Sequence, residues 1–255
     1  MPSVGLKAAR RHHEKSRLAA GAPSNVCTPP RDARSAARSR KAATISAMAE
    51  SIPLPRSIAG IDIPRDAVSE ATWRRAQRGL PRYLLAHSVR AYCWGAAIAR
   101  SEGWTFDRRV LWTASLLHDL GLTTLPRNDD CFEVSGGAYA RRFLTRAGLG
   151  ADEAERVDRA IVLHMQPGVT LADGVESVLL DRATGLDVRG AEYELVDEVR
   201  DAVVRAFPRG AFDRHFLAAI SREASARQTC QSARLLRTTG LAEWMERSPW
   251  ATKAS

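Results

Sequence analysis

Hydrophobic residues recur at three- and four-residue intervals from Asp66 almost to Trp250, the spacing of one face of an α-helix. Glycines fall between these periodic stretches, where helices commonly end. No convincing strand alternation and no internal repeat accompanies them. The fold class is therefore predicted to be all-α, a single domain of about seven to eight helices. The pattern places helices over residues 67–78, 83–101, 107–119, 133–148, 151–165, 175–187, 192–206 and 212–237.

The first 50 residues mix alanine, arginine, serine and proline without periodicity, a composition that cannot offset its ordering entropy by burial. We expect residues 1–50 to form a disordered basic tail and residues 51–255 the helical domain. The tail has three interpretations: an organellar transit peptide, a basic tail with a partner, or an extension upstream of a true start at Met48. The last is favoured, because arginine outnumbers lysine throughout the chain and is not special to the tail.

The net charge of +9 is concentrated in that tail. Residues 1–50 carry ten lysines or arginines against three acidic residues, a balance of +7, which leaves +2 for the rest. The helical domain therefore lacks the global positive field that attracts a polyanion. Nucleic acid is not expected as a partner.

The four cysteines lie far apart, without a CxxC pair or a secretory signal. Neither a thiolate zinc site nor a disulfide framework is expected, and a reducing, cytoplasmic setting follows by default. No apolar run approaches the roughly 20 residues that span a bilayer, so no membrane association is expected.

Several imidazole and carboxylate groups fall on apolar helix faces. His87 lies on a stripe with Leu84 and Trp94, and His118 shares a face with Val110. Asp119 follows at the helix end that Gly121 enforces, where two consecutive side chains can reach one ion.

His164 and Asp187 also occupy inward stripes. Each residue taken alone has an ordinary structural explanation, since a single histidine on an apolar face is more often a satisfied core residue. Asp187 could pair with Arg182 or Arg189. A buried aspartate otherwise requires a partner or a metal.

The string Leu-Leu-His118-Asp119-Leu-Gly-Leu-Thr, preceded by His87 and followed by Asp187, resembles the H…HD…D signature of the HD superfamily of metal-dependent hydrolases. Residues 69–235 more closely resemble its cyanamide hydratase branch, which often has asparagine where this chain has Val188. The resemblance implies an all-α fold. It also implies one divalent metal, most commonly zinc, with the ligands His87, His118, Asp119 and Asp187.

Two imidazoles and two carboxylates suit zinc, with manganese or iron as alternatives, and leave a position for water. Such a water could attack a small nitrile-like substrate, as in the conversion of cyanamide to urea. The candidate catalytic residues are Asp119, His164 as a proton relay or an orienting group, and Thr123. Candidate substrate contacts are Phe132, Glu133 and Trp94.

Two rival functions remain open. The chain could be a phosphohydrolase acting on a nucleotide or another phosphate ester, with Arg90, Arg127 or Arg189 as phosphate binders. Alternatively, it could be a non-catalytic binding module of the same fold. The expected partner is a small molecule, and a homo-oligomer is possible.

Overall fold

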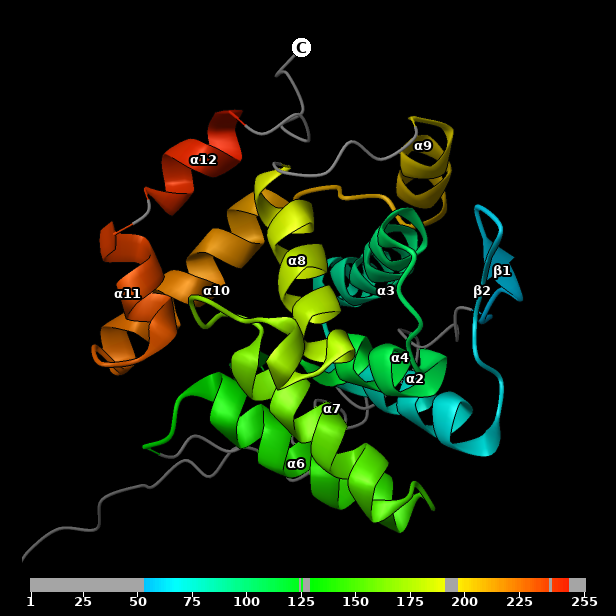
Figure 1. Ribbon diagram of the computed structural model, residues 1–255. Helices are drawn as coiled ribbons and strands as arrows, with labels where there is room; N and C mark the ends of the chain where they lie inside the picture. The colour runs from blue at the N-terminus through cyan, green and yellow to red at the C-terminus, as the bar shows by residue number, and fades with distance from the viewer. Residues whose placement is uncertain (1–52, 124, 126–128, 191–196, 239, 248–255) are drawn as a thin grey trace, which may run out of the picture. The chain divides into compact units, whose positions relative to one another are not determined.

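The computed structural model describes residues 53–247 except 124, 126–128, 191–196 and 239, and most of these residues are helical (Figure 1). The predicted all-α class is confirmed, whereas the predicted tail, residues 1–50, lies outside the described residues. The helices are α2 (Ala67–Gly79), α3 (Arg82–Glu102), α4 (Arg108–Leu117), α5 (Leu120–Thr123), α6 (Phe132–Arg146), α7 (Ala151–Leu163), α8 (Val175–Arg189), α9 (Asp197–Ala206), α10 (Phe212–Ala226), α11 (Gln231–Thr238) and α12 (Leu241–Arg247).

Local sequence explains where several helices begin and end. The Asp66 carboxylate accepts hydrogen bonds from the backbone amides of Val68 and Ser69 and so caps α2. Asp107 caps α4 in the same way. Gly103 ends α3 with a φ of 69°, a left-handed conformation that glycine adopts without a steric penalty.

The domain core forms around α3, which packs against α4 and α8, while α6 and α7 lie side by side (Figure 1). Tyr92, Trp94 and Trp112 are fully buried here. A short antiparallel hairpin, β1 (Ser57–Ile58) with β2 (Ile61–Asp62), precedes the helices. The Tyr92 hydroxyl joins it to α3 by donating to the Asp62 carbonyl.

The C-terminal part differs from the predicted single helix over residues 212–237. Arg227 leaves the helical conformation at φ −137° and ψ 82°, and α10 ends there. The chain turns before α11 begins at Gln231, and α12 then follows, which the periodicity did not predict. No glycine or proline marks the turn after α10.

The expectation that the cysteines form no disulfide is wrong. Cys131, at the start of α6, is joined to Cys230, just before α11, and their Cα atoms are 5.5 Å apart. The two cysteines are 99 residues apart in sequence, so no spacing motif announces the pair. Cys93 is a free, buried cysteine in α3. None of the described helices is long and apolar enough to cross a membrane.

Candidate metal centre

Three predicted metal ligands meet in the interior. His87 comes from the first half of α3, His118 from the residue that ends α4, and Asp119 from the residue after it. The Nε2 atoms of His87 and His118 are 3.2 Å apart, and Asp119 Oδ2 lies 3.3 Å from His118 Nε2 and 3.8 Å from His87 Nε2. All three residues are buried, and their ligand atoms lie within 4.8 Å of one another.

Hydrogen bonds on the far side of each imidazole fix which nitrogen carries the proton. His87 Nδ1 donates to Asp187 Oδ2 at 2.7 Å, and His118 Nδ1 donates to the Ser115 carbonyl at 2.7 Å. In the neutral rings both Nε2 atoms therefore present lone pairs toward each other and toward the Asp119 carboxylate. This arrangement is repulsive unless a proton or a cation lies among the three atoms.

Asp119 Oδ2 is buried and has no hydrogen-bond partner, which would be costly without a compensating ion. Burial would raise the pKa of Asp119, but His118 and His87 outweigh this and hold the pKa at about 2. The carboxylate is thus charged at neutral pH. Two imidazole nitrogens and one carboxylate oxygen are a donor set that fits a divalent cation such as zinc or ferrous iron.

Asp187, the fourth predicted ligand, does not converge with the other three. Its carboxylate lies behind His87, bonded to Nδ1, and therefore on the side of the ring opposite the three convergent atoms. Arg90 donates to Asp187 Oδ1 from Nε and to Oδ2 from its terminal nitrogen, at 2.8 and 2.7 Å. Trp94 Nε1 donates to Oδ1 at 2.8 Å. In this arrangement Asp187 orients the His87 ring.

Two residues with other expected roles instead bind the Asp187 carboxylate. Trp94, expected to contact substrate, is fully buried and binds Asp187 instead. Arg90, considered as a phosphate binder, is fully buried by the same carboxylate and by the Phe207 carbonyl. Arg209, which donates to the Asp187 carbonyl, was not identified from sequence because it lies 22 residues beyond its partner.

His164, at the end of α7, borders the three-residue cluster. Its ring lies edge-on to that of His118, with centroids 5.0 Å apart. Its Nδ1 donates to the Ile161 carbonyl, which leaves Nε2 as an acceptor. Burial and the neighbouring His118 lower the pKa of His164 to about 3, so the ring is neutral near pH 7. It therefore suits the acceptance of a hydrogen bond better than the donation of a proton.

The other predicted site residues lie outside the cavity. Phe132 is buried behind His164, with ring centroids 5.9 Å apart. Glu133 is buried near Glu223, and burial together with that carboxylate raises its pKa. Thr123 is exposed and directs its hydroxyl to the carbonyl of Gly79, the last residue of α2, at 3.4 Å.

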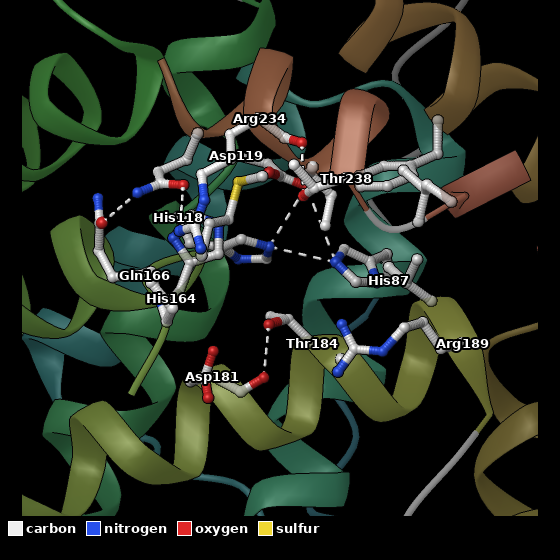
Figure 2. Close-up of a pocket in the computed structure, with 18 of the residues that line it drawn as sticks. His87, His118, Asp119, His164, Gln166, Asp181, Thr184, Arg189, Arg234 and Thr238 are labelled. Carbon is white, nitrogen blue, oxygen red and sulfur yellow. Dashed lines mark hydrogen bonds and ion pairs between the residues drawn. The ribbon is translucent and has the colours of Figure 1, made fainter. Parts of the chain in front are cut away.

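A cavity of about 290 Å³ opens beside the three convergent ligands. Figure 2 shows His87, His118 and His164 on one side and the α8 residues Asp181, Thr184 and Arg189 on the other. Residues of α11 close it, and Gln231 there donates to Gln166. Sequence reasoning missed the α11 residues, since only tertiary packing brings that helix to the site.

Comparison with protein families supports this assembly. Residues 84–206 match the family model of the HD domain, a span that includes His87, His118, Asp119, His164 and Asp187. No curated protein matches the chain.

Proposed function

We propose that this HD-domain protein is a mononuclear metal-dependent hydrolase or hydratase, with the ion held by His87, His118 and Asp119. The observation that carries the proposal is the convergence of two imidazole Nε2 atoms and an unpartnered carboxylate oxygen on one buried point. Zinc is expected first, and manganese or ferrous iron share the donor set. No other such cluster occurs among the residues that the structure describes.

A divalent cation held here would lower the pKa of water toward about 7 and so supply a nucleophile near neutral pH. With three protein ligands, the cavity side of the ion stays open for water and substrate. His164 Nε2, neutral and free to accept, is placed to orient the attacking water. Asp187 holds His87 in the tautomer that points Nε2 inward.

Two reactions fit this machinery. Addition of water to a nitrile of the cyanamide type is the first candidate, supported by the resemblance of residues 69–235 to that branch. Hydrolysis of a phosphate ester is the second, and one observation favours it: Arg189 and Arg234 line the cavity. Both reactions require the same metal and differ in the substrate.

The test begins with metal content. We expect the purified full chain to carry one divalent ion per molecule by elemental analysis, and His118→Ala to lose it while remaining folded. His215→Ala is the matched control, because that histidine is exposed and stacks on Tyr83, away from the cavity. Metal retained in His118→Ala would contradict the proposed ligand set.

Activity is then assayed as urea formed from cyanamide and as phosphate released from a nucleoside monophosphate. Turnover of either compound that disappears in His118→Ala and persists in His215→Ala supports the enzyme and identifies its class. A metal-loaded protein that turns over neither would favour the third interpretation, a binding module.

A further inference from the structure

The cavity extends beyond what a small neutral nitrile needs. Its volume of about 290 Å³ is near the lower bound of ordinary small-molecule sites. One end is formed by the three metal ligands and His164, and the rest by residues 165–168, Phe216 of α10, and residues of α8, α11 and the start of α12. A substrate whose reacting group lies at the ligands therefore has room for a second part beside α8 and α11.

Positive charge dominates the cavity lining away from the metal ligands. The cavity's formally charged side chains are Asp119, Asp181, Arg189 and Arg234. Asp119 belongs to the metal-ligand cluster, and in the rest of the lining the two guanidinium groups exceed the charge of Asp181 by one. This part of the cavity therefore attracts anions, with or without a bound ion.

Several arginines in the described part of the domain lie beside carboxylates, in the pairs Arg90–Asp187, Arg109–Glu153, Arg156–Glu176 and Arg227–Glu223, whereas the two cavity arginines do not. Among the described residues, Arg189 has no carboxylate partner, and its guanidinium carbon lies 5.7 Å from the centre of the Trp244 ring. Arg234 contacts the side-chain oxygen of Gln231 at 3.4 Å and, within the same part of the chain, no carboxylate. Their donors remain available to a ligand.

A glycine makes room for Arg189 on α8. A Cβ atom at Gly185 would lie 2.6 Å from a terminal nitrogen of Arg189, so any larger residue would displace the guanidinium. Figure 2 shows Arg189 directed along α8 toward Thr184, with Arg234 on the opposite wall. The two groups therefore face one cavity from different helices.

We propose that Arg189 and Arg234 form an anion subsite, and that the substrate carries a carboxylate or phosphate group bound there while its reacting group lies at His87, His118 and Asp119. Guanidinium groups bind both kinds of anion through paired hydrogen bonds. The proposal rests on the proposed function for the position of the reacting group. The anion subsite itself is independent of the metal.

The experiment measures binding of inorganic phosphate and of acetate to the metal-free full chain by isothermal titration calorimetry. Phosphate binding alone would point to a phosphate-bearing substrate, acetate alone to a carboxylate, and both to the shared chemistry. Arg189→Gln and Arg234→Gln should each weaken binding about tenfold or more, the loss of a charge-assisted hydrogen bond.

Arg182→Gln is the control, because this arginine of α8 pairs with Glu102 and does not line the cavity. It should bind as the wild type does. His118→Ala separates the two proposals: it should keep anion binding even though it loses the metal. Absence of binding to both anions, or equal weakening in Arg182→Gln, would overturn the subsite and leave the metal centre standing.

Discussion

Asp187 connects the predicted metal ligand His87 to the surrounding core. It accepts hydrogen bonds from His87, Arg90 and Trp94, and Arg209 lies 3.3 Å from the same carboxylate. Removing its charge leaves the fully buried Arg90 guanidinium without an anion, which typically costs about 3–5 kcal/mol. The carboxylate therefore stabilises the fold and also fixes the His87 tautomer.

We expect Asp187→Asn to lower the free energy of unfolding by about 3–5 kcal/mol in urea denaturation. Metal affinity should fall about 10- to 100-fold, because the amide orients His87 less well, with the stoichiometry still one. Trp94→Phe removes only one hydrogen bond to the same carboxylate and serves as the milder companion. A folded Asp187→Asn protein that binds no metal at any concentration would instead make Asp187 a ligand.

Residue-scale prediction from sequence had a physical limit here. Inward-facing histidines and aspartates could be recognised because polar groups on apolar helix faces need partners. Which atom of each group meets which neighbour depends on helix rotation and on arginines distant in sequence. His87, His118 and Asp119 converge, whereas the Asp187 carboxylate lies on the far side of the His87 ring.

At the scale of elements, the short helix α5 carries the chain away from the His118–Asp119 pair, and Gly121 lets it approach α6. A Cβ atom at Gly121 would lie 2.8 Å from the Phe132 carbonyl carbon and closer still to its oxygen. Backbone atoms cannot rotate aside, so α5 and the start of α6 would have to separate. The spacing of these elements sets where His118 and Asp119 stand.

We expect Gly121→Ala to lower the free energy of unfolding by about 1–3 kcal/mol, the usual cost of overpacking. Gly136→Ala is the matched control, because this buried helical glycine has its nearest neighbour, the His118 carbonyl oxygen, at an ordinary 3.5 Å. That variant should be neutral or stabilised by up to about 1 kcal/mol through helix propensity. Equal stability of the two variants in urea denaturation would refute the close-contact argument.

Element prediction succeeded where local chemistry decides and failed where tertiary contacts do. Helices α2 and α3 follow from periodicity, an Asp66 cap and a Gly103 end. The break after α10 has no glycine or proline to announce it, and the chain there is tied to α6 through Cys230. The length of a helix is thus partly set by residues far away in sequence.

At the scale of the whole domain, the Cys131–Cys230 disulfide connects α6 to the segment that begins α11. The closed loop spans 99 residues, and a constraint of that length on the unfolded chain is worth up to about 5 kcal/mol in the chain-entropy model. It also holds α11, the helix that brings Gln231 and Arg234 to the cavity. Stability and the shape of the cavity are therefore linked through one covalent bond.

Replacing both cysteines by serine should lower the thermal unfolding temperature, and a reductant should lower that of the wild type but leave the double variant unchanged. Cys93→Ala, which alters the free cysteine of α3, should keep its sensitivity to reductant. Since α11 loses its covalent anchor, the double variant should also bind inorganic phosphate more weakly than the wild type. Identical unfolding of the wild type with and without reductant would show that the bond contributes nothing to the folded domain.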